Sequence, residues 1–134
     1  MATHAVTSQD FNQVVESNDL VFVDFWATWC GPCRAFGPTF EKASEANPDV
    51  YFAKVDIDQN PDLAAAAKVQ AVPTLMVVKK QQIIVQQAGA LRASDLDDLI
   101  SQAKALDMDA AASDGDTASS GDAKVKTPSS QSER

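Results

Sequence analysis

Residues 20–33 of the chain read LVFVDFWATWCGPC and decide which fold the sequence specifies. The nearly continuous apolar run over 20–26 predicts a strand that is buried on both faces and is therefore central in a sheet. Proline is well tolerated in the first turn of a helix, so a helix is expected to begin near Pro32. Two cysteines, Cys30 and Cys33, are thus expected where a buried strand passes into a helix.

Hydrophobic patterning on both sides of this stretch predicts further strands and helices in alternation. The other expected strands cover residues 4–6, 50–56, 74–78 and 83–85, and a short helix is expected over 61–68. The longer helices place apolar residues on one face, namely Phe11, Val14 and Val15; Phe36, Phe40 and Ala43; and Leu96, Leu99, Ile100 and Ala103. Such alternation favours an α/β fold with a largely parallel sheet covered on both sides. The closing pair of adjacent strands, read as a hairpin, adds an antiparallel edge.

Short polar residues mark where several of these elements are expected to begin. Thr7 or Ser8 is expected to cap the first helix. Asn60 and Ser94 are expected to cap the short helix and the last helix. The hairpin turn over 79–82 has no glycine, so the sequence leaves its turn type open.

The chain has 134 residues, a formal net charge of -8 and a pI near 4.4. So acidic a protein repels phosphate backbones and anionic lipid surfaces, and neither nucleic-acid binding nor membrane binding is expected. Every aromatic residue precedes residue 107, and 107–134 contains neither Leu nor Ile. The sequence therefore predicts a folded domain over 1–106 and a disordered, acidic and Ser-rich tail over 107–134. We interpret the tail as a solvated extension, with a docking or regulatory arm as the alternative.

Cysteine usage and hydropathy indicate the compartment. No apolar run reaches the roughly 18 residues needed to span a bilayer. The first twenty residues show no secretory signal. Two cysteines cannot build the disulfide framework of a small secreted domain, so a cytoplasmic protein with a catalytic or metal-binding cysteine pair is expected. The protein is also expected to be a monomer.

The spacing of Cys30 and Cys33 suits reversible disulfide chemistry. Two intervening residues, Gly31 and Pro32, let the sulfurs meet across the first helical turn. The amides at the helix start and the positive end of the helix dipole are expected to favour the thiolate of Cys30. Cys30 is expected at the exposed mouth of the motif as the attacking thiol. Cys33, one turn into the helix and more buried, is expected to resolve the mixed disulfide.

The alternative interpretation of the cysteine pair is half of a zinc site. A closed structural zinc site takes four ligands, mostly Cys and His. His4 is the only histidine, and nothing in the sequence places it beside the cysteines. No metal site is therefore expected, and His4 is expected to be an ordinary strand-edge residue.

The segment 23–33 resembles the active-site strand and loop of the thioredoxin family, with its Trp-Cys-Gly-Pro-Cys motif. The resemblance continues through Lys54, residues 72–75 and the region of Gly89, and covers about residues 4–106. It implies the thioredoxin fold, a central mixed sheet of about five strands flanked by about four helices. It also implies a protein-disulfide reductase that maintains cell redox homeostasis by reducing client proteins. Such an enzyme binds no cofactor and is regenerated by a thioredoxin reductase with NADPH.

Asp24 interrupts the apolar strand, and burial of a carboxylate raises its pKa. The resemblance implies that Asp24 is a buried acid/base that helps to deprotonate Cys33 through water, and that Lys54 lies near this carboxylate. The alternatives are an Asp24 side chain that reaches a helix cap or water, and a Lys54 that is solvated at a strand end.

The resemblance also implies a surface on which clients dock. It implies a cis bond at Val72-Pro73, with Pro73 packed against the sulfurs and the Val72 backbone free to pair with an extended client segment. The residues implied for this flat apolar surface are Trp29, Gly31, Pro32, Val72 and Gly89. The alternatives are an ordinary proline that enters a strand and a glycine turn before the last helix.

Some positions depart from the common family pattern. Ala71 stands where glycine is frequent, and Arg34 replaces a common lysine while keeping the positive charge. Two rival functions are a disulfide oxidase or isomerase on the same fold, and a binding module whose cysteines are incidental. The Gly-Pro pair between the cysteines favours the reductase by likeness to the family. The joint match of several separate segments favours an enzyme over a binding module.

Overall fold

The computed structural model describes residues 2–108 of the chain. The chain divides into two units, Met1–Lys104 and Ala105–Arg134, and the sheet belongs to the first. Residues 109–134 of the expected tail lie outside the described residues, so the domain boundary at residue 106 stays a prediction. None of the helices within residues 2–108 has the length and apolar character needed to cross a membrane.

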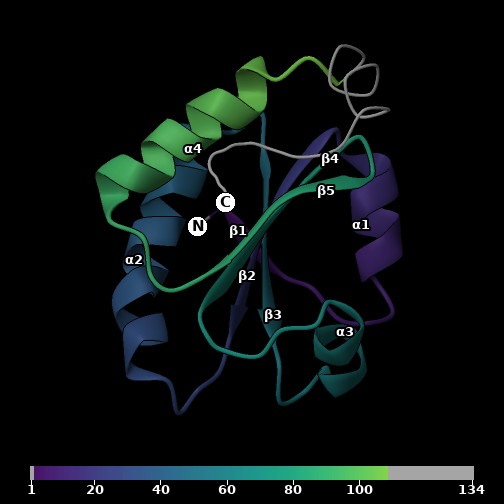
Figure 1. The fold of residues 1–134 in the computed structure, drawn as a ribbon, viewed down its shortest axis with the longest axis vertical. Coiled ribbons are helices and arrows are strands. Elements are labelled where there is room, and N and C mark those ends of the chain that lie inside the picture. Colours follow the sequence, from purple (N-terminus) through teal and green to yellow (C-terminus); the bar gives the residue numbers. More distant parts are fainter. Residues whose placement is uncertain (1, 109–134) are drawn as a thin grey trace, which may run out of the picture. The chain divides into compact units, whose positions relative to one another are not determined.

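A mixed sheet lies at the centre of the first unit (Figure 1). In the described part of the chain its five strands have the order β1-β3-β2-β4-β5. The strands are β1 (Thr3–Ala5), β2 (Leu20–Trp26), β3 (Tyr51–Asp56), β4 (Thr74–Lys79) and β5 (Gln82–Ala88). Strands β1, β3 and β2 are parallel, whereas β4 is antiparallel to β2 and β5 is antiparallel to β4. The predicted central strand and antiparallel hairpin edge are confirmed.

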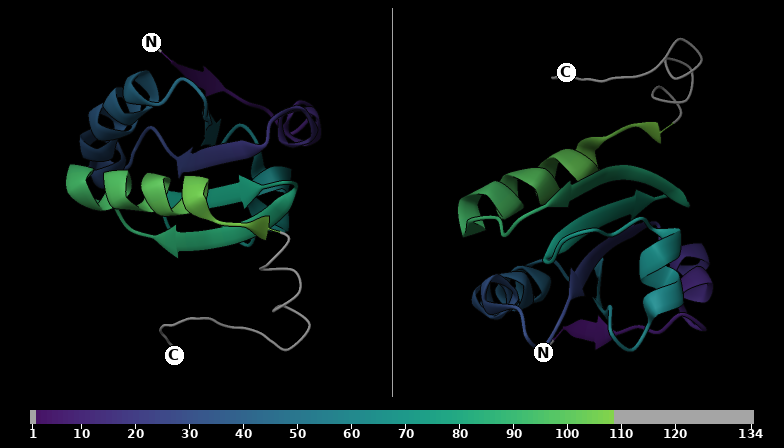
Figure 2. Two further views of the ribbon diagram at one scale, coloured as in Figure 1. Left: turned by 90° about the horizontal axis from the view of Figure 1, so that it is seen from above. Right: turned by 60° about the horizontal axis from the view of Figure 1, so that its bottom comes forward.

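Helices cover both faces of this sheet. They are α1 (Phe11–Ser17), α2 (Gly31–Ala46), α3 (Pro61–Ala66) and α4 (Ala93–Ala105). Helices α2 and α4 lie on one face, and α1 and α3 lie on the other (Figure 1 and Figure 2). The α/β fold with a mixed sheet between two helical layers is therefore confirmed.

The two faces carry separate apolar clusters because side chains alternate along a strand. On the α2 side, Phe22 and Phe40 pack against Phe52, with the rings of Phe40 and Phe52 centred 5.2 Å apart. On the other side, Val23 and Phe25 pack beneath α1 and α3. All of these side chains are fully buried. The two-sided burial explains why β2 reads as a continuous apolar run.

Helix α1 begins at Phe11 with Asp10 as its N-cap, so the predicted cap at Thr7 or Ser8 is wrong. The Thr7 hydroxyl donates to the Asp10 carboxylate at 3.0 Å, and its carbonyl accepts the N–H of Phe11. The N–H of Ser8 donates to Asn60 Oδ1 at 3.0 Å. Both residues therefore form a turn ahead of the helix, where their polar groups already have partners.

Of the other two predicted caps, Asn60 has the predicted position and Ser94 does not. Asn60 occupies the N-cap position of α3, but its side chain makes no capping bond. It accepts from Ser8 and donates to the carbonyl of Asp56 instead. Ser94 lies inside α4, which begins at Ala93. Short polar residues thus indicate the right region for a helix start, but neighbouring segments compete for their hydrogen bonds.

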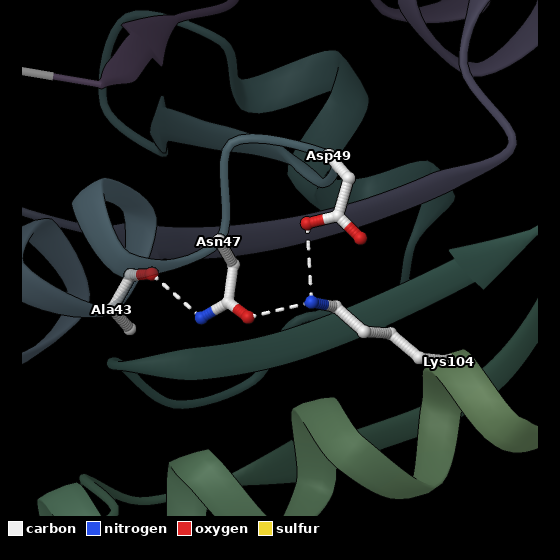
Figure 3. A network of polar contacts seen from close by, with 4 residues as sticks. All are labelled: Ala43, Asn47, Asp49 and Lys104. Atoms are coloured by element: carbon white, nitrogen blue, oxygen red, sulfur yellow. Dashed lines mark hydrogen bonds and ion pairs between the residues drawn. The ribbon is translucent and has the colours of Figure 1, made fainter.

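A polar network joins the end of α4 to the loop between α2 and β3 (Figure 3). Lys104 Nζ donates to Asn47 Oδ1 at 2.7 Å and to Asp49 Oδ1 at 3.1 Å. Asn47 in turn donates from Nδ2 to the carbonyl of Ala43 at 2.9 Å. The network therefore links α4 to the carboxyl end of α2, opposite the end that carries the cysteines.

Lys79 at the end of β4 is buried, and its Nζ donates to the carbonyls of Ala103 at 2.6 Å and Lys104 at 3.1 Å. Carbonyl groups at a helix C-terminus lack partners within the helix, and the helix dipole is negative there, so an ammonium group stabilises them. The sequence predicted Lys79 only as part of the hairpin turn. Nothing in the local pattern indicates that the end of α4 lies beside it.

The turn that joins β4 to β5 consists of Lys80 and Gln81, because Lys79 pairs directly with Gln82. Lys80 has a φ of 49° and Gln81 a φ of 67°. Positive φ at both positions of a two-residue hairpin loop corresponds to a type I′ turn. The turn type that the sequence left open is therefore one that residues with long side chains adopt at a cost.

The double substitution Lys80→Asn/Gln81→Gly is expected to stabilise the protein by about 1 kcal/mol, because asparagine and glycine accept positive φ. Urea unfolding of the oxidised protein should show a higher midpoint with an unchanged slope. Gln82→Gly is the control, because Gln82 lies within β5, where glycine weakens a strand. A midpoint for the double variant at or below that of the parent would contradict the assigned turn type.

Candidate functional site

A disulfide joins Cys30 and Cys33 where β2 passes into α2. Cys30 is the N-cap of α2, which begins at Gly31, and the Cα atoms of the two cysteines are 5.3 Å apart. Cys30 Sγ accepts the backbone N–H of Cys33 at 3.1 Å. The predicted strand-to-helix junction is confirmed. The first sulfur lies where the free N–H groups and the positive end of the helix dipole face it.

The two cysteines are about equally buried, which contradicts the expectation of an exposed Cys30 and a deeper Cys33. Their exposed fractions are 4% and 5%. The disulfide holds the sulfurs together, and Ala27, Trp26 and Val72 form one apolar cluster with them. Cys30 comes first in the motif but is not the more exposed cysteine of this oxidised form, because a loop distant in the sequence covers its sulfur.

That covering loop precedes β4. The Val72–Pro73 bond is cis, as the resemblance implied, and the Val72 carbonyl oxygen lies 3.5 Å from Cys30 Sγ. Gly89 donates its N–H to the Pro73 carbonyl at 2.8 Å and has a φ of +105°. This φ lies in the region that favours glycine. Gly89 therefore combines the expected turn with a place beside the cis-proline.

Trp29 projects from the loop before α2 with an exposed fraction of 64%. Its indole Nε1 donates to Asp58 Oδ2 at 2.9 Å. Asp58 follows β3, and the carboxyl ends of the parallel strands β2 and β3 meet at one edge of the sheet. Asp58 was not among the site residues predicted from the sequence. The acidic loop directly after a predicted buried strand is the signal that could have found it.

The other residues of the expected docking surface lie next to the disulfide on accessible turns. Gly31 and Pro32 are exposed at the start of α2, Gly89 is exposed, and Val72 is half-buried. A methyl group added at Gly31 would meet no atom within 4 Å, so the space above it is open. The covered sulfurs are thus bordered by groups that a partner can reach.

Asp24 is buried in β2 with an exposed fraction of 1%, and neither carboxylate oxygen has a hydrogen-bond partner among residues 2–108. It lies in register between Lys54 of β3 and Leu75 of β4. Burial raises the pKa of Asp24 from 3.8 to about 7, and the Lys54 charge opposes this rise. The raised pKa expected from the sequence is confirmed. Asp24 can therefore exchange a proton near neutral pH.

Lys54 lines a surface cleft of about 400 Å³ on the α2 side of the sheet. Its ammonium nitrogen lies 5.1 Å from the centroid of the Trp26 ring. A methyl group added at Gly37 of α2 would come 3.9 Å from the same nitrogen. Cys33 also lines this cleft. Lys54 is therefore a neighbour of Asp24 in the sheet and shares a cleft with Cys33.

His4 lies on the edge strand β1, where its ring stacks on Tyr51 of β3 with the ring centroids 4.7 Å apart. It is thus a strand-edge residue, as expected. Within the described part of the chain, no three or more His, Cys, Asp or Glu side chains gather in a way that could hold a metal ion.

Comparisons with known proteins agree with this architecture. The family model described as Thioredoxin matches residues 2–102. "Putative thioredoxin 2" of Streptomyces coelicolor is 50% identical over 108 residues, which cover 81% of each chain. "Thioredoxin C-3" of Corynebacterium nephridii is 39% identical over 98 residues, which cover 72% of this chain and 68% of that one.

Solved thioredoxin structures share the fold. A mutant thioredoxin from Halobacterium salinarum matches with a TM-score of 0.74 at 34% identity, covering 78% of this chain and 93% of that one. The oxidised form of mitochondrial thioredoxin 3 from Saccharomyces cerevisiae matches with a TM-score of 0.69 at 37% identity, covering 75% and 94%. Family model, sequence relatives and solved structures agree, and the chain belongs to the thioredoxin family.

Proposed function

We propose that this thiol–disulfide oxidoreductase reduces protein disulfides with Cys30 as the attacking thiol and Cys33 as the resolving thiol. The observation that carries the proposal is the position of Cys30 Sγ at the start of α2, where it accepts the N–H of Cys33. The same N–H and the helix dipole stabilise a thiolate on reduced Cys30. The short spacing keeps Cys33 within reach of the sulfur that it must attack.

The reaction passes two electrons to the client in two displacement steps. The Cys30 thiolate attacks one client sulfur, the client S–S bond breaks, and the released client thiolate takes up a proton. Deprotonated Cys33 then attacks the Cys30 sulfur of the mixed disulfide, so the second client thiol leaves and the Cys30–Cys33 disulfide closes. A thioredoxin reductase returns two electrons from NADPH and reopens this disulfide, so the chain itself needs no bound cofactor.

Asp24 is proposed to accept the proton of Cys33, through water, in the second step. Its pKa of about 7 supports this role, because both protonation states are populated at neutral pH. Lys54 is proposed to assist, because its positive charge favours the ionised carboxylate. On the other side of Asp24, Leu75 brings no competing charge.

A client is proposed to dock beside the disulfide on the residues Trp29, Gly31, Pro32, Val72 and Gly89. Support comes from their accessibility and from the Val72 carbonyl at 3.5 Å from Cys30 Sγ. An extended client segment that pairs with the Val72 backbone would bring its own disulfide to Cys30. Pro73 is proposed to hold this loop in place, supported by the hydrogen bond that its carbonyl accepts from Gly89.

The proposed function also includes partners, a compartment and an oligomeric state. Membership of the family implies a thioredoxin reductase and disulfide-containing clients as partners. We propose a cytoplasmic location and a role in cell redox homeostasis. The formal net charge of -8 supports a protein that binds neither nucleic acid nor membranes. We propose that it acts as a monomer.

The test is a coupled assay in which the chain, a thioredoxin reductase and NADPH act on insulin. NADPH consumption is expected to depend on both the chain and insulin. The reduction potential, measured against glutathione, separates a reductase from an oxidase or isomerase. A potential as oxidising as that of the periplasmic disulfide oxidants, or no NADPH consumption, would contradict the proposed function.

A further inference from the structure

We propose that Glu41 is a positioning residue that keeps the surface cleft beside Cys33 narrow by clamping β1 to α2. The inference rests on the proposed role of Cys33 as the resolving thiol. Glu41 lines the same cleft as Cys33 and Lys54. Its carboxylate accepts the N–H of Ala2 at Oε2, at 2.9 Å, and the hydroxyl of Thr3 at Oε1, at 2.6 Å.

Strand β1 needs such an anchor because none of its side chains is buried. It comprises only Thr3–Ala5, lies at an edge of the sheet and pairs with β3 alone. His4 and Ala5 are exposed, and Thr3 is half-buried. A short edge strand with little buried apolar surface opens locally at a low free-energy cost. Thr3 and Glu41 are 38 residues apart, so their hydrogen bond ties together two separate elements.

The helical spacing puts the clamp on the same face of α2 as the resolving thiol. Cys33, Gly37 and Glu41 follow one another at four-residue intervals, so they lie in a row along the helix. The nearness of Gly37 to Lys54 Nζ shows that this row lies over β3. Thr3 stands on β1, the strand next to β3. The hydrogen bond from Thr3 to Glu41 therefore spans the cleft from one wall to the other.

A narrow cleft shields Cys33 better than a wide one from molecules that do not dock as clients. Cys33 lines the cleft, whereas Trp29 and Val72 of the proposed docking surface do not. The cleft is therefore a separate approach to the resolving thiol. If β1 separated from α2, small oxidants and alkylating molecules would reach Cys33 without docking. The hydrogen bond from Thr3 lowers the pKa of Glu41, so Glu41 remains an ionised acceptor at neutral pH.

The experiment measures how fast iodoacetamide alkylates Cys33 in a Cys30→Ser background, where Cys33 is the single thiol of the full chain. Thr3→Val removes the hydroxyl at nearly constant volume, and Glu41→Ala removes both acceptor oxygens. Thr3→Val is expected to raise the alkylation rate about tenfold, the factor that corresponds to loss of one hydrogen bond to a charged group. Glu41→Ala loses the bonds from both Ala2 and Thr3 and is expected to raise the rate at least as much. Thr3→Ser keeps the donor and is expected to leave the rate unchanged.

Glu45→Ala is the matched control, because Glu45 is an exposed glutamate of the same helix and does not line the cleft. Urea distinguishes local opening of β1 from a lower stability of the whole domain. When urea brings the parent to the stability of Thr3→Val, the parent is still expected to alkylate more slowly. Equal rates for Glu41→Ala and Glu45→Ala, or for the two proteins of matched stability, would overturn the proposal. Alkylation requires no client, so this failure would leave the reductase function intact, and only the insulin assay tests that function.

Discussion

Cys30→Ser is expected to reduce insulin at least about 1,000-fold more slowly than the parent, because a serine hydroxyl does not attack a disulfide sulfur. Serine suits this N-cap position, since its oxygen can accept the N–H of Cys33 that Cys30 Sγ accepts now. The variant should therefore fold, and its loss of activity reports on the chemistry. The turbidity of insulin under excess dithiothreitol measures the rate. A rate equal to that of the parent would show that Cys30 is not the attacking thiol.

Cys33→Ser provides the contrasting variant. It keeps the attacking thiol but cannot close the ring, so the reaction is expected to stop at the mixed disulfide. Mass spectrometry after incubation with insulin should find a client chain bound to Cys33→Ser and none bound to Cys30→Ser. The opposite pattern would exchange the roles assigned to the two cysteines.

Asp24→Asn is expected to stabilise the protein above neutral pH. Burial raises the pKa of Asp24 from 3.8 in the unfolded chain to about 7 in the fold. The stability that the neutral carboxyl contributes is fully present below about pH 4 and is lost as the pH rises through about 7. A shift of this size corresponds to an upper limit of about 4 kcal/mol. Asparagine cannot ionise, so the variant should keep this stability at high pH.

Urea unfolding of the oxidised parent and of Asp24→Asn, at pH values from about 4 to about 9, checks this expectation. The two proteins should be equally stable at the acid end and diverge as the pH rises. Asp97→Asn changes an exposed aspartate of α4 and should alter stability little at any pH. Parallel stability curves for the parent and Asp24→Asn would contradict the raised pKa.

The same substitution should make the enzyme slower. Without a carboxylate to take the proton of Cys33, the second displacement step is expected to slow about 100-fold at neutral pH. Release of the second client thiol from a preformed mixed disulfide, followed in single-turnover mode, measures this step. An unchanged rate would remove Asp24 from the proposed mechanism while leaving its effect on stability. A gain in stability with a loss of rate is typical of a strained functional group.

The central strand and the cysteine-bearing helix could be predicted because their signals are local. The apolar run over 20–26 coincides with β2, and α2 begins at Gly31, next to the expected Pro32. The burial of Asp24 followed from the same run, since a strand packed on both faces has no solvent-facing position for it. These predictions needed no knowledge of which other segments lie nearby.

Contacts between distant segments could not be predicted in the same way. The bonds from Trp29 to Asp58 and from Thr3 to Glu41 depend on which strands and helices become neighbours. The expected exposure of Cys30 is wrong for the same reason, because Val72, 42 residues away, covers its sulfur. Local periodicity gives the type of an element but not its neighbours in space.

The buried ammonium group of Lys79 provides a way to measure the motion of α4. Its hydrogen bonds to the carbonyls of Ala103 and Lys104 keep it from acylating reagents while α4 rests on the sheet. Exposed lysines such as Lys42 and Lys80 react directly. The lag between their labelling and that of Lys79 therefore records how often the end of α4 lifts away. Mass spectrometry measures this lag on the unmodified sequence, so no probe has to be attached.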